Sequence, residues 1–125
     1  MILRVARHTN QLAAIEAFYT KALNLKVLGR FEGHTGYDGL FLGRTGLDWH
    51  LEFTVSPHQA EHQPDEDDLL VLYPTTQAEH DALLASIEAA GIERQQPRNP
   101  YWEAHGVLVL DPDGFGVVVS NRKVG

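Results

Sequence analysis

The chain has 125 residues, 43% of them hydrophobic, which is enough apolar material for one globular domain with its own core. Its formal net charge of −7 at pH 7, with no clustered basic residues, argues against nucleic acid and anionic membranes as partners. The absence of cysteine excludes disulfides, thiolate catalysis and zinc-finger ligation. The chain shows neither a signal-peptide pattern nor an apolar run long enough to span a bilayer, so we expect a soluble cytoplasmic protein.

The first half of the chain predicts a strand, a helix and three more strands. An aliphatic segment at 2–7 is the first strand, and Thr9-Asn10-Gln11 supplies capping residues for the helix that follows. Apolar residues then recur at spacings of three and four, which is typical of one buried helical face: Leu12, Ile15, Phe18, Tyr19, Ala22 and Leu23. Asn24 is a residue type that often ends a helix in a left-handed conformation. Further strands are predicted at 26–31, 39–42 and 49–55.

The second half repeats this order after a polar segment at 56–67, which we interpret as an exposed linker. A strand is predicted at 68–73, and Thr76-Gln77-Ala78-Glu79 has the spacing of a capping box at a helix start. Gly91 is a natural end for that helix. Short strands are predicted at 92–96, 107–110 and 117–120, while 99–102 is predicted as a loop.

The two halves therefore look like one duplicated unit. The helix ends at Asn24 and Gly91 have nearly the same sequence offset as Glu52 and Val118, which lie in the last strand of each half. Such a repeat predicts two modules side by side around a cavity, within one domain over 1–125. Module one is 1–55, the linker is 56–67 and module two is 68–125. The alternative is a generic α+β sandwich without duplication.

Four segments carry a resemblance to a known superfamily. They are Phe18-Tyr19-Thr20-Lys21-Ala22-Leu23-Asn24-Leu25, Ile87-Glu88-Ala89-Ala90-Gly91, Asp111-Pro112-Asp113-Gly114 and the strand His50-Leu51-Glu52-Phe53. In this order they resemble the vicinal oxygen chelate superfamily of glyoxalases, bleomycin-resistance proteins and extradiol dioxygenases. The resemblance implies an α+β fold, in which two βαβββ modules form a cupped mixed sheet with helices on the outer face.

The resemblance also implies a divalent-metal site with four ligand positions, which correspond here to Arg4, Glu52, Asp68 and Val118. A guanidinium has no lone pair to donate and valine has no donor atom, so the inherited ligand set is incomplete. An Arg beside two carboxylates would instead pair with one of them or with an anionic ligand. We leave these two alternatives open.

A rearranged metal site is the other prediction for this region. Strand alternation places His50 and Glu52 on one face, and His8 shares the face of Arg4 if the first strand extends that far. His8, His50 and Glu52 would then form a facial triad for a first-row metal. The alternative is that His8 caps the strand end and His50 bonds to water or backbone.

Three aromatic residues in the second half are candidate ligand contacts. Tyr101 and Trp102 are adjacent in the predicted loop, and Tyr73 ends a strand. Tyr101 and Trp102 would form a lid or stacking wall over an apolar or aromatic ligand, or they would cover the sheet end or fill a dimer interface. Tyr73 would point its hydroxyl into the cup, or it is a buried tyrosine without a chemical role. His50 and Asp68 are further candidate ligand contacts.

These residues support two functions of different class. The first is an enzyme, a lyase, isomerase or dioxygenase acting on a small oxygen-bearing substrate, with Glu52 as base or ligand and Arg4 as its electrostatic partner. The second is a metal-free ligand-binding or drug-binding protein that resembles the bleomycin-resistance proteins. In both cases the partner is a small molecule. Exposed edge strands further predict a homodimer.

Overall fold

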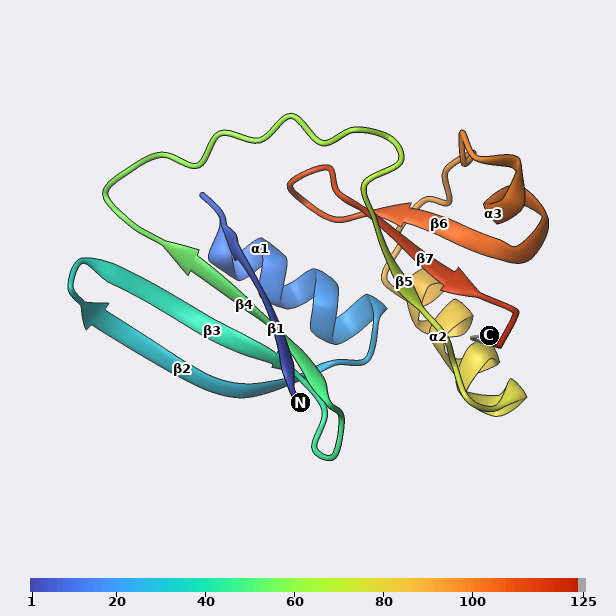
Figure 1. Ribbon diagram of the computed structural model, residues 1–125, viewed down its shortest axis with the longest axis horizontal. Helices are drawn as coiled ribbons and strands as arrows, with labels where there is room; N and C mark the ends of the chain where they lie inside the picture. Colours follow the sequence, from blue (N-terminus) through green and yellow to red (C-terminus); the bar gives the residue numbers. More distant parts are fainter. Residues whose placement is uncertain (124–125) are drawn as a thin grey trace. The chain divides into compact units, whose positions relative to one another are not determined.

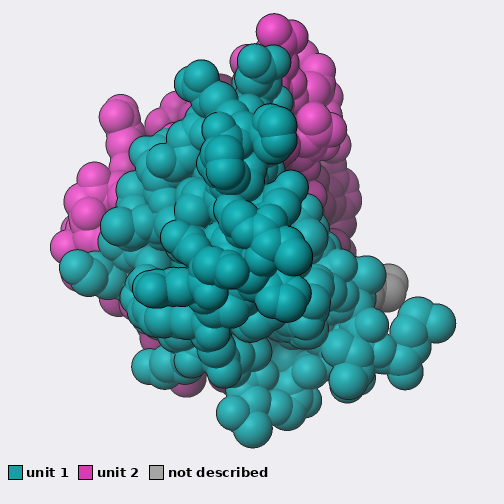
Figure 2. Space-filling view, turned by 90° about the vertical axis from the view of Figure 1, so that its left-hand side faces the viewer, with its two compact units in different colours: residues 1–62 teal, residues 63–125 magenta. Residues whose placement is uncertain are grey.

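The computed structural model describes residues 1–123, which form two compact units (Figure 1). Unit 1 comprises residues 1–62 and unit 2 begins at Gln63; the two are coloured teal and magenta in Figure 2. The segment 56–67 contains neither helix nor strand. In the described part of the chain, no helix is long and apolar enough to cross a membrane.

Unit 1 is a βαβββ module. Its elements are β1 (Leu3–His8), α1 (Leu12–Ala17), η1 (Phe18–Ala22), β2 (Lys26–His34), β3 (Tyr37–Gly43) and β4 (Trp49–Val55). The four strands form one sheet in the order β1-β4-β3-β2, in which β1 runs parallel to β4 and the other pairs are antiparallel. The α+β fold with a βαβββ unit is therefore confirmed for this half.

The helix of unit 1 covers one face of the sheet with its predicted apolar stripe. Ile15, Phe18, Tyr19 and Leu23 are buried, and the Tyr19 ring lies 5.1 Å from that of Phe53 on β4. The last turn, η1, is a π-helix, and Asn24 ends it at φ 59°, the predicted left-handed conformation. Buried strand residues alternate along β3 and β4, at Leu40, Leu42, Leu51 and Phe53. The residues between them face the opposite side of the sheet, which no helix of unit 1 covers.

Unit 2 follows the same plan with a reduced sheet. Its elements are β5 (Leu69–Leu72), α2 (Gln77–Ala89), α3 (Pro100–His105), β6 (Gly106–Leu110) and β7 (Gly116–Ser120). The strand order is β5-β7-β6, with β5 parallel and β6 antiparallel to β7. The strand predicted at 92–96 is reduced to one bridge between Gln95 and Leu108. The polar run around Gln95 and the proline at position 97 explain this, because proline cannot donate to a strand ladder.

The segment predicted as a loop at 99–102 begins a short helix instead. The Asn99 side chain accepts a hydrogen bond of 3.0 Å from the backbone N–H of Tyr101, and Pro100 occupies the first turn. Asparagine as a cap followed by proline is a recognised helix start, so the sequence carried this signal. The correction matters because α3 holds Tyr101 and Trp102 in a fixed arrangement.

Each half of the segment 56–67 is hydrogen-bonded to the unit to which it belongs. Its first half is tied to the β1–α1 turn, where Asn10 Nδ2 donates to the Ala60 carbonyl (2.9 Å) and the Ala60 N–H donates to Asn10 Oδ1 (2.7 Å). Its second half is held by Arg98, whose guanidinium donates to Asp65 (2.6 Å) and Asp67 (2.8 Å). Each half of the linker therefore belongs to its own unit, which is why the boundary lies between His62 and Gln63.

An ion pair between Glu16 and Arg30 connects α1 with β2 in unit 1. Nη1 and Nη2 of Arg30 donate to Oε1 and Oε2 of Glu16, at 2.7 and 2.5 Å. This hydrogen bonding lowers the pKa of Glu16 below its usual 4.5. A carboxyl with a depressed pKa stabilises the fold above its unfolded pKa, and the contribution is lost as the pH falls through the folded value.

We therefore predict that Glu16→Gln lowers the Tm by a few degrees near pH 7, because exposed ion pairs contribute little. The difference from the unmodified protein should be smaller at an acidic pH, below the lowered pKa of Glu16, than at pH 7. Thermal unfolding followed by circular dichroism at both pH values measures this. An equal difference at both would show that the ion pair does not stabilise the fold.

Candidate functional site

The sequence-predicted residues of unit 1 meet on the open face of its sheet. In the parallel pairing of β1 with β4, Arg4 lies opposite His50 and Ala6 opposite Glu52, while Phe41 of β3 lies on the other side of Glu52. Paired residues point to the same face. Because Leu51 and Phe53 face the helix, the side chains of this group face away from it.

Arg4 is the centre of this group. Its Nε donates to His50 Nε2 at 2.9 Å, and its Nη1 lies 3.8 Å from Glu52 Oε2. Its guanidinium carbon lies 4.6 Å from the centre of the Phe41 ring, so the cation reaches across β4 and stacks on that ring. The Arg4 side chain is 49% exposed but that of Glu52 only 17%, so the group presents mainly its positive charge. We call Arg4, His50, Glu52 and Phe41 the Arg4 site.

An apolar floor adjoins the Arg4 site. The Phe31 ring on β2 lies 5.7 Å from that of Phe41. A Cβ built on Gly39 would lie 2.4 Å from Phe31 Cζ, so the Phe31 ring lies over Gly39. A Cβ on Gly43 would likewise lie 3.0 Å from Leu28 Cδ1. The sequence analysis did not assign a role to Phe41; the alternation Gly39-x-Phe41-x-Gly43 was the signal that could have identified this floor.

His8 does not join His50 and Glu52 around a common point. It lies opposite Thr54, four residues along the pairing from His50, which corresponds to about 13 Å. Its Nε2 lies 3.0 Å from Ser56 Oγ near the end of the strand, while His50 accepts from the Arg4 side chain and not from the backbone. Among residues 1–123, no group of three or more His, Cys, Asp or Glu is arranged to hold a metal ion.

The four positions that the resemblance implied for a metal do not fit one either. Arg4 brings a cation, and Val118 is a fully buried aliphatic residue within the sheet of unit 2. Asp68 Oδ2 accepts a hydrogen bond of 3.1 Å from the Asp65 N–H, which builds the turn before β5. Glu52 remains as an oxygen donor in this set, and its carboxylate lies 3.8 Å from the Arg4 guanidinium.

The three predicted aromatic residues of unit 2 form a cluster of their own. The rings of Tyr101 and Trp102 meet edge to face at 4.8 Å, Tyr73 lies 6.4 Å from Trp102, and His105 lies 4.7 Å from Tyr101. Trp102 packs close to Gly106, whose Cβ would lie 3.3 Å from Trp102 Cε3. Tyr101 remains 50% exposed and Tyr73 37% exposed. Trp102 is thus anchored on β6, while the two tyrosines offer open ring surface.

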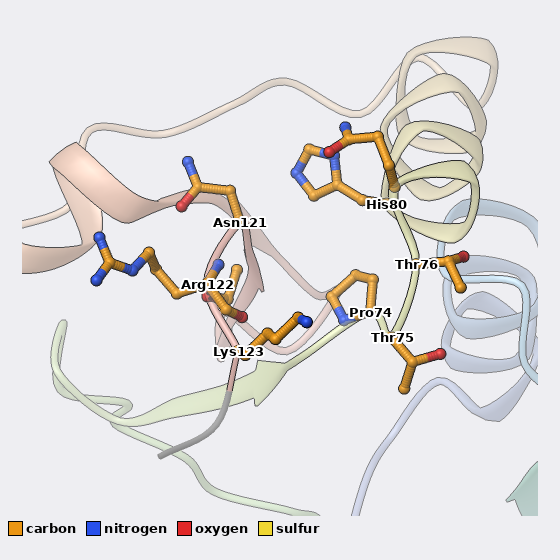
Figure 3. Close-up of a pocket in the computed structure, with 9 residues that line it drawn as sticks. Pro74, Thr75, Thr76, His80, Asn121, Arg122 and Lys123 are labelled. Atoms are coloured by element: carbon orange, nitrogen blue, oxygen red, sulfur yellow. Dashed lines mark hydrogen bonds between the residues drawn. The ribbon is translucent and has the colours of Figure 1, made fainter.

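A small polar pocket lies at the start of α2 and was not predicted from the sequence. Its volume is about 110 Å³, and Figure 3 shows Lys123, Asn121 and His80 around it. The full lining is Pro74, Thr75, Thr76, Gln77, His80, Ser120, Asn121, Arg122 and Lys123. Glu79 already occupies the helix start, because its carboxylate accepts from the Thr75 N–H (2.9 Å) while its own N–H donates to Thr76 Oγ1 (3.1 Å).

Comparison with known families gives a clear result. The family model described as the YycE-like N-terminal domain matches residues 3–54, and the YycE-like C-terminal domain matches residues 67–121. The chain belongs to the YycE-like family. Protein YycE of Bacillus subtilis (strain 168) is 39% identical over 122 residues, covering 97% of this chain and 88% of its own length.

Solved structures extend the relationship to the superfamily. A crystal structure of a YycE protein from Bacillus subtilis matches with a TM-score of 0.88 at 38% identity, over 99% of this chain and 91% of that one. The trypanothione-dependent glyoxalase I of Leishmania major matches at 0.72 and 21% identity, over 97% and 86%. TnmS3, an antibiotic-binding protein from Streptomyces, matches at 0.68 and 19%, over 96% and 93%. The last two likenesses concern the fold, which is that of the vicinal oxygen chelate superfamily, as the resemblance implied.

The position of the Phe31 ring over Gly39 can be tested by substituting this glycine. Gly39→Ala places a methyl group 2.4 Å from Phe31 Cζ and 3.1 Å from the Phe53 carbonyl oxygen, so it should destabilise the fold by about 1–3 kcal/mol in urea titrations. Gly29→Ala is the matched control, because its methyl group meets only Phe41 Cδ2, at 3.4 Å. Equal stability of the two variants would contradict the described floor.

Proposed function

We propose that this protein binds a small organic anion without a metal ion, at the Arg4 site on the open face of unit 1. The observation that carries the proposal is the position of the Arg4 guanidinium, which lies between His50, Glu52 and Phe41. A permanent cation at this point favours a ligand with a carboxylate or phosphate group. It shares metal-free ligand binding with the second of the two functions that the sequence supports, but its ligand is an anion and its site lies in unit 1.

The hydrogen bonding of Arg4 leaves donors for such a ligand. His50 uses the Nε–H, while the nearest carboxylate oxygen of Glu52 lies 3.8 Å from Nη1, beyond hydrogen-bonding distance. The hydrogens of Nη1 and Nη2 can therefore be donated to two oxygens of a ligand, the geometry that guanidinium and carboxylate share. Because Arg4 is half exposed and Glu52 is largely covered, a ligand meets the cation first.

The same geometry opposes a metal ion at the Arg4 site. His50 Nε2 accepts a hydrogen bond from Arg4 Nε–H, so its lone pair is already engaged. A divalent cation held by Glu52 would lie close to a guanidinium of the same sign, which raises the energy of both. The fold is compatible with either function, since its neighbours include a glyoxalase I and an antibiotic-binding protein.

Metal-free proton transfer is a second candidate function, and one observation favours it. The Glu52 carboxylate is 17% exposed and accepts no hydrogen bond from the other residues of the described chain. A carboxylate in this condition can take a proton from a ligand that Arg4 holds, with Arg4 stabilising the negative charge that develops.

The predicted homodimer and cytoplasmic location stay predictions.

Metal content tests the first half of the proposal. Protein purified without a metal-affinity tag should contain far less than one equivalent of any transition metal by elemental analysis. Titration with Mn²⁺, Fe²⁺, Ni²⁺ or Zn²⁺ should give no micromolar binding that depends on Glu52. A near-stoichiometric metal that is lost in Glu52→Gln, with the fold intact by circular dichroism, would overturn the proposal.

Anion binding tests the second half. Acetate, benzoate and inorganic phosphate are titrated into ¹⁵N-labelled protein, and the Nε–H signal of Arg4 and the amides of β1 and β4 are followed. At least one anion should shift these signals in a saturable way, and Arg4→Met should abolish the effect. Arg94→Met, which changes a cation in unit 2, is the control and should leave it unchanged. Shifts that persist in Arg4→Met, or none with any anion, would refute binding at the Arg4 site.

A further inference from the structure

We infer that the preferred ligand of the Arg4 site is an aromatic carboxylate, with its carboxylate on Arg4 and its ring on the floor made by Phe41 and Phe31. This inference rests on the proposed function and names the class of ligand. Its argument is the juxtaposition of a half-exposed cation with two neighbouring aromatic rings on the same sheet face.

The strand order brings the cation and the rings together. Arg4 is on β1, Phe41 on β3 and Phe31 on β2, so the guanidinium crosses β4 to reach the Phe41 ring at 4.6 Å. Phe31 lies next in the same direction, with its ring 5.7 Å from that of Phe41 and inclined by 40°. A carboxylate bound at the outer nitrogens of Arg4 therefore has an aromatic surface beside it, within reach of a directly attached ring.

The rings of the floor have room on the sheet because glycines alternate with the large side chains. Gly39 provides the space that the Phe31 ring occupies, and Gly43 does the same for Leu28. Flanking side chains at these positions would stand up from the sheet and divide the surface. Two neighbouring rings inclined by 40° favour a planar ring over a branched aliphatic group, since a planar ring can approach both phenyl rings in an offset or edge-to-face arrangement.

The guanidinium adds a preference of its own for an aromatic ligand. It already stacks on Phe41, and its other face is exposed to solvent in part, since the side chain is 49% exposed. Aromatic faces attract guanidinium groups through their negative electrostatic potential. A ligand ring that lies beside both the Arg4 guanidinium and the Phe31 ring would therefore gain a cation–π contact in addition to the burial of its apolar surface.

Three carboxylates separate the contributions of charge, apolar area and aromaticity. Acetate carries only the anion, cyclohexanecarboxylate adds apolar area without aromaticity, and benzoate adds a planar ring. Dissociation constants come from the NMR titrations of the intact chain, with the Arg4 Nε–H signal as the reporter. We expect benzoate to bind about tenfold more tightly than acetate, and more tightly than cyclohexanecarboxylate.

Phe41→Leu tests whether the floor is responsible, because leucine keeps the apolar volume and removes the ring. In this variant, benzoate should lose its preference and bind about as tightly as cyclohexanecarboxylate, each measured relative to acetate in the same variant, since Arg4 also loses its stacking partner. The Gly39→Ala variant, in which Phe31 must move, gives a second route to the same loss if Phe41→Leu folds poorly. Arg4→Met should abolish the binding of all three carboxylates.

The possible outcomes distinguish the two proposals. Equal, Arg4-dependent binding of the three carboxylates would overturn the aromatic preference and leave the anion site standing. A benzoate preference that survives both Phe41→Leu and Gly39→Ala would also overturn it, because the ring would then bind elsewhere. No Arg4-dependent binding of any carboxylate would refute the proposed function together with this inference.

Discussion

The hydrogen bond from Arg4 Nε to His50 Nε2, at 2.9 Å, determines what the open face of unit 1 can do. It fixes the guanidinium plane, uses the imidazole nitrogen that would otherwise coordinate or accept from a ligand, and leaves the outer guanidinium nitrogens free to bind an anion. Stacking on Phe41 at 4.6 Å holds the same plane from the other side. The open face of unit 1 therefore has a guanidinium at its centre.

This interaction depends on the register of two parallel strands. Pairing of Arg4 with His50 on β1 and β4 places the two side chains on the face opposite the α1–η1 helix. The burial of Leu51 and Phe53 against the helix determines this register, because a shift of β4 by one residue would exchange its two faces. Core packing therefore positions the site, although none of the core residues belongs to it.

Much of this arrangement could be predicted from local sequence signals. Asn24 ends the first helix, Thr76 caps the second, and Glu52 shares the face of His50 by simple alternation, all as the structure shows. The stacking of Arg4 on Phe41 could not be predicted, because it depends on a long side chain that crosses a neighbouring strand. The separation of His8 from His50 likewise follows from the interstrand register, which periodicity alone does not give. The helix at 100–105 was missed although its signal, Asn99 before Pro100, was local.

The tautomer of His50 tests this account most directly. If Arg4 Nε–H donates to Nε2, the neutral imidazole must carry its proton on Nδ1. The ¹⁵N chemical shifts of the two ring nitrogens, measured at about pH 8 where imidazoles are ordinarily neutral, distinguish the tautomers. The account predicts a protonated Nδ1 and an unprotonated Nε2, and a change in this pattern in Arg4→Met. A proton on Nε2 in the unmodified protein would show that Arg4 is not held by His50, and the Arg4 site would not exist as described.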